Sequence, residues 1–593
     1  MRPMDMKPSG EALSPMLAAL RACRRHFVLA ATFSAMVNIL YLAPSLYMLQ
    51  VYDRAVPTQG VVTLALLTLI FIVTIGAMSG LDYVRGRLLI RASARLDRLL
   101  ASDVIDASLK ARPGENPSPY AMREFDNLRQ TLTGPAILAL IDAPWAPIYI
   151  AVCFLLHPAL GVLALAGSAL LALITYLNEK ATSKKLQQAN VGASQAYSLL
   201  DSSAQASGVI KALGMRAAMV QRHLRERRPA AVLQAQASFS SVGFTSIAKS
   251  ARLLLQSFAI GLGAYLAIKH QISPGSIFAA SLLVSRALAP IEQLTGTWKN
   301  IVQARGAYRS LTALFERHGI EEARTALPPP TGRIDVERLV VASPERDRAI
   351  LADISFIVEA GDSVGIVGPS GSGKSTLVKS LVGAIDAAAG AIRYDGAEIR
   401  DWPGESLAQR LGYCSQEPSL FKGTIKQNIA RFDTELFEDA AAIDRAVVEA
   451  AQLCGAHEFI LRLPKGYDTE LGWGGAGLSV GQAQRIALAR AFYGDPAVIV
   501  LDEPNAHLDA QGEALLIQAM QALKERGVTL LTVAHRTGVL ASVNKLMLIR
   551  NGKIELYGPK DEVLAQLQEG GGKSPGPAPA AVPGRPSPTS EAA

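Results

Sequence analysis

The sequence contains few cysteines, and none is placed for metal or disulfide chemistry. The four cysteines among 593 residues are Cys23, Cys153, Cys414 and Cys454. They form no CxxC pair and no cluster with histidine. Because zinc sites and disulfide frameworks need close, regular spacing, neither is indicated. We expect reduced thiols with a structural role.

Two further absences bound the architecture. No internal repeat is visible along the chain. The last 24 residues, GGGKSPGPAPAAVPGRPSPTSEAA, lack the large apolar side chains from which a core is built. Gly/Pro/Ala/Ser-rich segments of this kind do not bury enough surface to offset the loss of chain entropy. We therefore predict a disordered tail over residues 569–593.

Hydrophobic residues, by contrast, are abundant. They make up 50% of the chain, the mean hydropathy is +0.22 and the net charge is +8. The length predicts about three or four domain-sized units. A positive charge can indicate nucleic-acid binding, but here Lys and Arg lie beside long apolar runs. That arrangement favours a membrane protein with no nucleic-acid partner.

Six apolar stretches are long enough to span a membrane. Each has about 18–24 residues, which suffices for a hydrocarbon core of roughly 30 Å. They cover residues 26–49, 61–84, 135–156, 158–177, 251–268 and 276–297. A signal peptide is the alternative for the first stretch, but the stretch is too long and has no clear cleavage site. We predict a polytopic helical membrane domain over residues 26–310, preceded by a short cytoplasmic segment, 1–25.

The loop charges orient these spans. Arg21, Arg24 and Arg25 precede the first span, and the long segments 85–129 and 180–252 are rich in Arg. The other connections are short and nearly uncharged, at 53–59, 157–158 and 269–274. Positive loops stay in the cytoplasm, so both termini and both long loops belong there. The long loops have a helical pattern, as in 202–234, and such helices could extend the spans beyond the membrane.

Three charged residues lie within or near the predicted spans. Asp142 occurs in LALIDAPWAPIYIAV, and Arg286 and Glu292 occur in LLVSRALAPIEQL. Because a charge that faces lipid is costly, we expect these side chains to face a cavity or a partner. A structural ion pair, or a side chain that reaches the interface, is the equally weighted alternative.

The second half of the chain alternates strand-like and helical segments, typical of an α/β domain, which we place at 334–568 after a linker at 311–333. Residues 363–378, SVGIVGPSGSGKSTLV, contain the phosphate-loop pattern GxxxxGK[ST] between a strand-like run and a helical run. In this pattern glycines let the backbone wrap phosphates, the lysine reaches the β- and γ-phosphates and the hydroxyl ligates Mg²⁺. The predicted nucleotide-binding residues are Gly368, Pro369, Ser370, Gly371, Ser372, Gly373, Lys374, Ser375 and Thr376.

A buried strand downstream, AVIVLDEPNAHLD at 497–509, ends in two acids. Asp502 is placed to hold Mg²⁺ and Glu503 to orient the attacking water. Strand-end carboxylates can also be simple caps, but a pair downstream of a phosphate loop favours catalysis. Gln416, in GYCSQEPSLF, and His535, in LLTVAHR, each follow a strand-like run. Gln416 can sense Mg²⁺ and water, and His535 can hold the γ-phosphate; alone, each would be an ordinary polar residue.

A second phosphate-seeking loop lies between these motifs. The segment 477–491, GLSVGQAQRIALARA, is a short Ser/Gly loop that opens a helix. Backbone N–H groups at a helix start attract phosphate. The loop residues are Leu478, Ser479, Val480, Gly481 and Gln482. One nucleotide domain would thus carry two phosphate loops.

Together the motifs resemble those of ATP-binding cassette (ABC) ATPases. GPSGSGKST, the Gln416 loop, LSVGQ, LDEP, the HLD at 507–509 and His535 occur in that family's order and spacing. The resemblance implies ATP and Mg²⁺ as cofactors, with Ser375, Gln416 and Asp502 at the metal, and Asp509 in a loop that couples two domains. It also implies that LSVGQ closes over the ATP of a second copy, hence a homodimer.

The membrane half also looks like a particular branch of ABC exporters. LYLAPSLYMLQVYDRAVPTQG, DAPWAPIYIAVCFLLHPALG, SARLLLQ…GLGAYLAI and SRALAPIEQLTGTWKN are similar to type I secretion exporters of the protease/lipase (PrtD-like) type. The resemblance covers about residues 20–568. It implies ATP-driven export of an unfolded protein with a C-terminal signal, from a bacterial inner membrane. The implied partners are a periplasmic membrane-fusion adaptor, an outer-membrane channel, the secreted protein and membrane lipid.

Two departures from the pattern matter. Many ABC domains place an aromatic residue ahead of the phosphate loop to stack on adenine, whereas the position here is Ser343 or a neighbour, with no aromatic nearby. This leaves nucleotide affinity and selectivity open. In addition, no peptidase domain precedes the first span, so we expect no cleavage of leader peptides.

Three other functions compete with protein export. A lipid or drug exporter would share the fold. A membrane-anchored regulatory ATPase would translocate nothing, but an intact Glu503 beside LSVGQ argues against it. A nucleic-acid ATPase is disfavoured by the hydrophobic spans.

Overall fold

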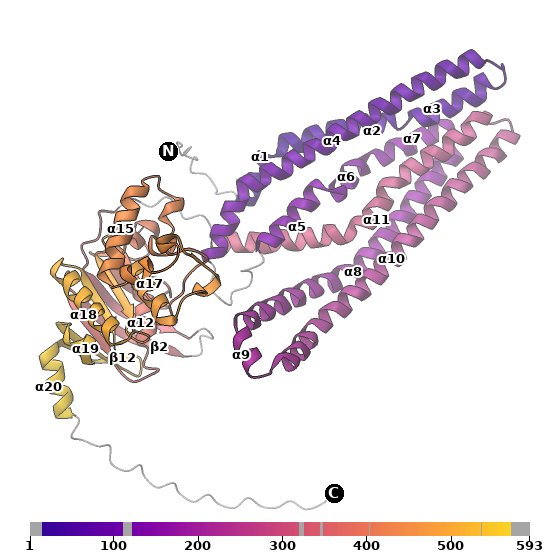
Figure 1. Cartoon of the computed structure of the whole chain (residues 1–593). Coiled ribbons are helices and arrows are strands. Elements are labelled where there is room, and N and C mark those ends of the chain that lie inside the picture. The colour runs from indigo at the N-terminus through magenta and orange to yellow at the C-terminus, as the bar shows by residue number, and fades with distance from the viewer. Residues whose placement is uncertain are drawn as a thin grey trace, which may run out of the picture. The chain divides into compact units, whose positions relative to one another are not determined.

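The computed structural model of the chain describes residues 15–110, 121–318, 325, 327–343, 348–402, 404–534 and 537–570. The predicted tail beyond residue 570 and the first 14 residues lie outside these ranges. The chain divides into two compact units, Met1–Ile320 and Glu321–Ala593, and we describe each separately (Figure 1).

Long helices build the first unit. They are α1 (Pro15–Ala22), α2 (Arg24–Leu40), α3 (Ala43–Gln50), a π-helical turn η1 (Val51–Ala55), α4 (Val61–Lys110), α5 (Ala121–Thr133), α6 (Pro135–Asp142), a 3₁₀ turn η2 (Ala143–Trp145), α7 (Ala146–Leu156), α8 (Pro158–Gln205), α9 (Ser207–Ala212), α10 (Arg216–Ile268) and α11 (Pro274–Arg317). Within the described ranges, six segments are long and apolar enough to cross a membrane, as the sequence predicts.

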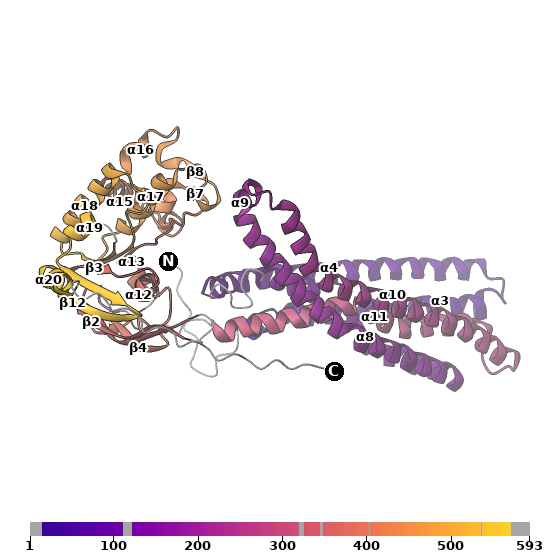
Figure 2. The ribbon, with the colours of Figure 1, turned by 90° about the horizontal axis from the view of Figure 1, so that it is seen from below.

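The helices continue far beyond the predicted spans. The helix of the fifth span begins at Arg216, and α8 and α10 lie side by side and are joined through α9 (Figure 2). The prediction that the long loops are helical extensions of the spans is therefore confirmed. The turn between the third and fourth spans is confirmed as well. There His157 has an extended backbone, its Nδ1 accepts the N–H of Ala159 at 3.1 Å, and Pro158 begins α8, where its missing N–H costs nothing.

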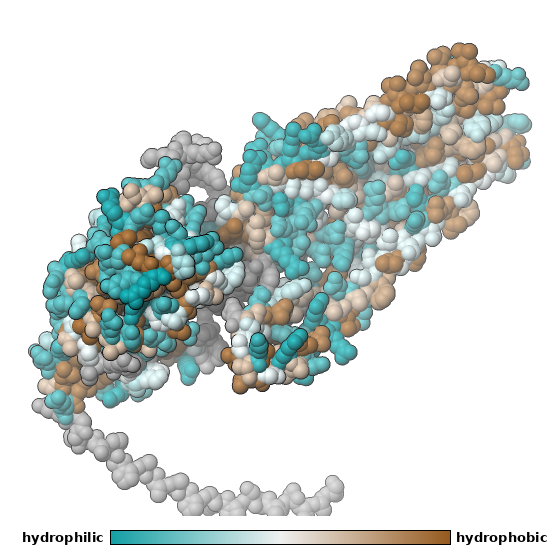
Figure 3. Space-filling model, in the orientation of Figure 1, coloured by the Kyte–Doolittle hydropathy of each residue, from teal (hydrophilic) through white to brown (hydrophobic). Residues whose placement is uncertain are grey.

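Small residues lie where these helices pack. Buried Ala248, Ala259, Ala280 and Ala287 are examples, and small side chains let helix backbones approach closely. Large apolar side chains point outward instead, as at Leu66, Ile70 and Val73 of α4, which are 57–64% exposed. Figure 3 shows such hydrophobic surface at the end of the unit that carries α3. An apolar exterior over polar pairs is the pattern of a multi-pass membrane protein.

Asp142 is part of a buried polar network. Its carboxylate accepts hydrogen bonds from Arg85 Nη1 at 3.1 and 3.2 Å, from Asn38 Nδ2 at 2.8 Å and from Ser34 Oγ. Arg85, which the sequence placed at the start of a cytoplasmic loop, is 6% exposed within α4. It also pairs with Asp82 at 2.5 Å. The network joins α2, α4 and α6, so Asp142 is the structural ion pair that the sequence left as an alternative.

The other two charged residues are also engaged within the chain. Glu292 of α11 pairs with Arg252 of α10, and Arg252 Nη1 donates to Ser285 Oγ at 3.1 Å. The guanidinium of Arg286 lies 3.7 Å from the ring centroid of Tyr41, a cation–π contact. None of the three charges therefore serves as evidence for a hydrated path through the unit.

The described part of the second unit contains three sheets. The strands are β1 (Ile334–Ala342), β2 (Ala349–Val358), β3 (Ser363–Val367), β4 (Ala389–Tyr394), β5 (Ala397–Glu398), β6 (Leu411–Cys414), β7 (Gly423–Thr424), β8 (Glu470–Leu471), β9 (Val498–Asp502), β10 (Thr529–Val533), β11 (Lys545–Arg550) and β12 (Lys553–Pro559). One antiparallel sheet has the order β2-β1-β4-β5, and β7 pairs with β8. The largest sheet has the order β12-β11-β3-β10-β9-β6 and is parallel except for β12.

Helices pack on the sheets of this unit and on one another. They are α12 (Lys374–Leu381), α13 (Gly404–Gln409), α14 (Ile425–Ile429), α15 (Ala440–Leu453), α16 (His457–Leu461), α17 (Val480–Phe492), α18 (Ala510–Glu525), α19 (Thr537–Ala541) and α20 (Lys560–Gly570), with 3₁₀ turns at Asp433–Glu435, Gly466–Asp468 and Trp473–Gly475. One core lies between the two large sheets and includes Leu377, Val378 and Leu381 of α12. A second core packs α15, α17 and α18 against the six-stranded sheet. The predicted α/β class is confirmed, and the parallel strands place their carboxyl ends at one edge, where ligands bind.

We predict that Asp142→Ala destabilises the membrane unit. Removing the carboxylate leaves a buried Arg85 with the partly exposed Asp82 as its ion partner, and breaking a buried pair costs about 3–5 kcal/mol. Thermal unfolding of the detergent-solubilised protein measures the effect. The matched control is Asp106→Ala, which removes only an exposed pair with Lys110 and should change little.

The double variant Arg85→Met with Asp142→Leu makes the test sharper. Replacing both partners by apolar side chains removes the uncompensated charge, so much of the lost stability should return. A double variant less stable than Asp142→Ala would contradict the assignment of the pair.

Candidate functional site

The phosphate loop follows β3 and ends at α12. Gly368, Gly371 and Gly373 have φ values of +155°, +78° and +100°, a region that favours glycine. A Cβ on Gly368 would lie 2.2 Å from the carbonyl oxygen of Ile549, and one on Gly373 would lie 2.6 Å from Leu351 Cδ2. Gly368 therefore has no room for a side chain, while a side chain at Gly373 would strain the backbone and require Leu351 to move. Glycine-rich loops of this kind present backbone N–H groups to an anion.

Lys374, the first residue of α12, forms hydrogen bonds with carbonyl groups of the phosphate loop. Its Nζ donates to the carbonyl oxygens of Gly368 and Pro369, both at 2.9 Å, and the residue is 6% exposed. Burial lowers the pKa of the ammonium, and the nearby carboxylates of Glu503 and Asp502 act in the opposite direction. A cation that bonds only neutral carbonyls here is well placed to exchange them for phosphate oxygens.

Asp502 ends β9 next to this loop. It is 1% exposed and accepts a hydrogen bond from Ser375 Oγ at 3.3 Å. Burial raises the pKa of the carboxyl, the neighbouring Glu503 raises it further, and the Ser375 hydroxyl lowers it. A bound cation would relieve this unfavourable burial of charge.

This pair fits Mg²⁺. Among the residues the structure describes, no group of three His, Cys, Asp or Glu side chains could hold a metal alone. Mg²⁺ is usually held by one or two protein groups together with substrate phosphates. A hydroxyl and a carboxylate beside a phosphate loop are such a set.

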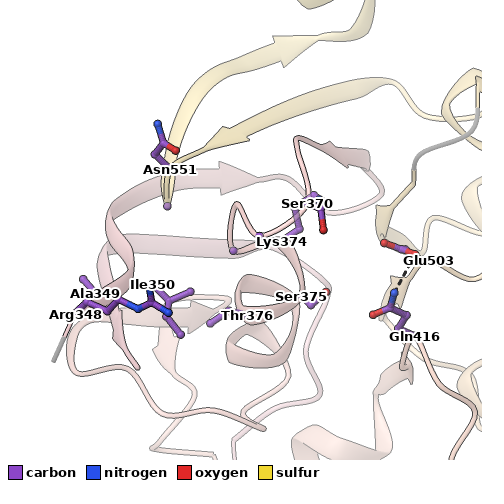
Figure 4. Close-up of a pocket in the computed structure, with 13 residues that line it drawn as sticks. Arg348, Ala349, Ile350, Ser370, Lys374, Ser375, Thr376, Gln416, Glu503 and Asn551 are labelled. Atoms are coloured by element: carbon purple, nitrogen blue, oxygen red, sulfur yellow. Dashed lines mark hydrogen bonds between the residues drawn. The ribbon is translucent and has the colours of Figure 1, made fainter. Parts of the chain in front are cut away.

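Glu503 and Gln416 face each other beyond the loop. Gln416 Nε2 donates to Glu503 Oε2 at 3.1 Å (Figure 4). Glu503 has a φ of +49°, and its N–H donates to the carbonyl of Val533 at 3.1 Å. An unusual backbone conformation at the end of a parallel strand often marks a functional residue. The sheet brings the two side chains together because β6 and β9 are neighbours.

Many of the predicted residues line one cavity of about 450 Å³, whereas Gly368, Pro369, Ser372 and Asp502 are not among its lining residues. Its predicted members are Ser370, Gly371, Gly373, Lys374, Ser375, Thr376, Gln416 and Glu503. The sequence reasoning missed five further lining residues, Arg348, Ala349, Ile350, Asn551 and Gly552. The last two form a tight turn between β11 and β12 with φ values of +52° and +74°, and Asn-Gly between strand-like runs was the available signal. Arg348 and its neighbours carried no local signal.

The second phosphate loop forms the N-terminal cap of α17. Ser479 caps α17 by accepting the N–H of Gln482, and the Gln482 side chain accepts the N–H of Ser479. A Cβ on Gly481 would lie 2.9 Å from the carbonyl oxygen of His507. None of residues 478–482 lines the nucleotide cavity. The fold of one chain therefore keeps this loop out of the cavity formed by the phosphate loop.

Asp509 links α17, the helix that follows the second loop, to the neighbouring helix α18 through hydrogen bonds. Its Oδ1 accepts the N–H of Gly512 at the start of α18 and the Nη2 of Arg485 in α17, both at 2.8 Å. The Gly512 N–H and then the Arg485 guanidinium hold the pKa of this carboxyl below its ordinary value. The predicted γ-phosphate residue, His535, lies outside the described residues.

Comparisons with known proteins agree with this geometry. Residues 351–506 match the family model of the ABC transporter domain, and residues 27–290 match that of the ABC transporter transmembrane region. The chain is 40% identical over 556 residues to the type I secretion system ATP-binding protein PrsD of Rhizobium meliloti (strain 1021), covering 93% of this chain and 94% of that protein. It is 28% identical to the alpha-hemolysin translocation ATP-binding protein HlyB of Escherichia coli O157:H7, covering 92% and 78%.

A solved structure shares the fold. A bacterial Atm1-family ABC exporter with ATP bound matches with a TM-score of 0.78 and 22% identity, covering 93% of this chain and 100% of that one. The chain belongs to the ABC transporter family and, within it, to the exporters of type I secretion. It is accordingly an ATPase whose hydrolysis of ATP is coupled to transport.

We predict that Glu503→Gln keeps ATP binding and lowers turnover by about 10²–10⁴-fold. The amide no longer accepts a proton from the attacking water, while Lys374 and the loop N–H groups still bind phosphate. Phosphate release and ATP binding by the purified protein are the measurements, with the exposed Glu458→Gln as the control. Phosphate release near the wild-type rate would reject the assignment.

Proposed function

We propose that this chain is the inner-membrane component of a bacterial type I secretion system. It would export an unfolded protein that carries its secretion signal at its own C-terminus. One observation carries this proposal, namely the 40% identity to a type I secretion protein over nearly the full length of both chains, membrane half included. The nucleotide domain alone would not distinguish a protein exporter from other exporters of the family.

A cavity within the membrane unit supports a polypeptide passenger. It has a volume of about 950 Å³. Its residues come from 123–127, 179–202 and 298–310, just beyond the predicted cytoplasmic ends of the third, fourth and sixth spans. Polar residues are the more numerous in the lining, although apolar atoms make up the larger share of its surface; the polar residues include Asn127, Gln187, Asn190, Ser194, Ser198 and Gln303. Amide and hydroxyl side chains can both donate to and accept from the peptide groups of an extended chain.

A lipid or drug exporter of the same fold is the second candidate. The Atm1-family neighbour shows the shared fold and does not discriminate between the two candidates. The cavity mixes amides and hydroxyls with a larger share of apolar surface, so it does not by itself exclude a lipid, and the identity to a type I secretion protein is what favours the polypeptide. Membrane lipid would surround the apolar exterior of the spans.

The chemistry of one turnover follows from the site. The loop N–H groups and Lys374 bind the phosphates of ATP, and Glu503 accepts a proton from the attacking water, which Gln416 helps to orient. His535 would contact the γ-phosphate. Ser375, Asp502 and Gln416 would hold Mg²⁺, which neutralises phosphate charge when bound.

Two copies of the chain would complete the site. Because the fold keeps residues 478–482 out of their own chain's cavity, a partner copy is the natural recipient of this loop, and two-fold symmetry would satisfy both chains equally. ATP then forms part of the interface, so nucleotide binding stabilises closure. Asp509 would transmit the closure through Arg485 to α17.

The proposed role in secretion also implies a location and partners for this protein. The exporter would lie in the bacterial inner membrane with its nucleotide domain in the cytoplasm. It would work with a periplasmic membrane-fusion adaptor and an outer-membrane channel, and without nucleic acid. The chain would divide into segments 1–25, 26–310, 311–333, 334–568 and 569–593, although α11 continues to Arg317 and α20 to Gly570.

Mixed dimers test whether the second loop acts in trans. One chain carries Lys374→Ala and the other Ser479→Arg. In an equal mixture half of the dimers are mixed, and in the trans arrangement each has one site with both lesions and one intact site. About a quarter of the wild-type ATPase rate should return when sites turn over independently. Each mutant homodimer should be inactive.

A second mixture separates the alternatives. It combines wild-type chains with chains that carry both substitutions, and the trans arrangement predicts about a quarter of the wild-type rate. Sites formed within one chain would give no recovery in the first mixture and about half the rate in the second. If two intact sites must act together, the first mixture fails and the second still gives about a quarter.

Reconstituted secretion tests the passenger. In a host with the matching adaptor and outer channel, a reporter fused to the C-terminal segment of a candidate passenger should reach the medium. Secretion should stop with Glu503→Gln, and also when that segment is removed from the reporter. Secretion that persists without the segment would contradict the protein-exporter proposal. ATPase activity that is stimulated only by lipids would contradict it as well.

A further inference from the structure

The nucleotide cavity has two ends with different chemistry. Gln416 and Glu503 lie on one side of the phosphate loop, and Arg348, Ala349 and Ile350 lie on the other (Figure 4). Hydrolysis takes place at the carboxylate end, so the γ-phosphate belongs there. The nucleoside must then extend in the opposite direction, towards the start of β2.

No aromatic residue is available at the nucleoside end. The described lining residues include none. Ser343, at the position where related domains carry a stacking side chain, is 8% exposed, and the four residues that follow it are Pro, Glu, Arg and Asp. The Ser343 N–H donates to the carbonyl of Arg348 at 2.8 Å, which closes the connection between β1 and β2. A purine base here needs another surface to cover it.

Arg348 occupies the required place. It stands directly before β2, is exposed, and lines the cavity together with Ile350. Residues two apart on an extended chain point to the same face. Arg348 and Ile350 thus present a planar cation and an aliphatic side chain to the same part of the cavity. A guanidinium stacks on aromatic faces as an ammonium does not, because it is flat and weakly hydrated.

We propose that Arg348 is the surface on which the purine base of the nucleotide stacks, in place of the missing aromatic side chain. Stacking reads the face of a base and not its edge, so adenine and guanine nucleotides bind with similar affinity. Arg348 is a positioning residue: it holds the nucleoside end and does not touch the reacting phosphate. The inference rests on nucleotide binding in this cavity and not on the identity of the passenger.

Binding of ADP, GDP and pyrophosphate to the full-length protein tests the proposal. ADP and GDP carry a base and are not turned over, while pyrophosphate occupies the phosphate loop without a base. The variants are Arg348→Ala, Arg348→Lys, which keeps the charge and loses the plane, and Arg348→Tyr, which restores a plane without the charge. Arg462→Ala, which removes another exposed arginine of this unit, is the matched control.

Stacking predicts a particular pattern. Arg348→Ala and Arg348→Lys weaken ADP and GDP binding about tenfold, and Arg348→Tyr stays within about threefold of wild type. Pyrophosphate binding is unchanged in all variants, and Arg462→Ala binds every ligand like wild type. Unchanged melting temperatures show that each variant is folded.

Several results would overturn the assignment. ADP binding by Arg348→Lys equal to wild type would show that charge alone matters, and a parallel loss of pyrophosphate would place Arg348 at the phosphates. No loss in Arg348→Ala, or a loss in Arg348→Tyr as large as in Arg348→Ala, would remove the stacking role. If the wild-type protein itself bound no ADP, the nucleotide site would be wrong, which is a different failure.

Discussion

The turn of backbone around Lys374 is the constraint on which the second unit depends. Gly368 leaves no room for a Cβ, Gly373 has a φ of +100°, and the lysine Nζ donates to the carbonyls of Gly368 and Pro369 at 2.9 Å. This compact loop lets α12 begin directly after β3 and pack its apolar face between the two large sheets. Since β3 lies beside β10, and β10 beside β9, the same packing brings Asp502 and Glu503 close to the phosphate loop. The hydrolytic site is thus a consequence of how one loop is folded into the core.

The membrane unit follows a complementary rule, in which its charges find partners inside the chain. The Asp142 network, the Arg252–Glu292 pair and the Arg286–Tyr41 contact each join different helices. Pairing inside the bundle lets the outer surface remain apolar, as a bilayer requires. The structural support for the proposed passenger therefore does not come from these charges but from the cavity beyond the predicted cytoplasmic ends of the spans.

Local sequence patterns predicted most structural features of this protein. The features that they missed depend on contacts between segments that are distant in the sequence. Six spans, the turn at His157, the phosphate loop and the strand-end acids each have a signature within a few residues, and the structure contains them all. The ion partner of Asp142 has no such local signature, because Arg85 lies on another helix and its sequence context indicates a cytoplasmic loop. Arg348 was missed for the same reason: its place in the cavity follows from the β1–β2 connection and the distance of β2 from the phosphate loop, which no short motif records. The Asn551–Gly552 pair predicts a turn from the sequence, but nothing in the sequence places that turn at the nucleotide cavity.

The central claim is that each ATP lies between the phosphate loop of one chain and residues 478–482 of another. Cross-linking tests it most directly, with cysteine at Ser370 in one chain and at Val480 in the other. The native thiols can stay, since all four are buried and burial raises the pKa of Cys414 and Cys454 to about 12. In the Glu503→Gln background with ATP and Mg²⁺, a short bifunctional thiol reagent should join the two chains. A chain that carries both cysteines should give dimers and no internally linked monomer. An internal cross-link at equal or greater yield, without a link between chains, would contradict the account.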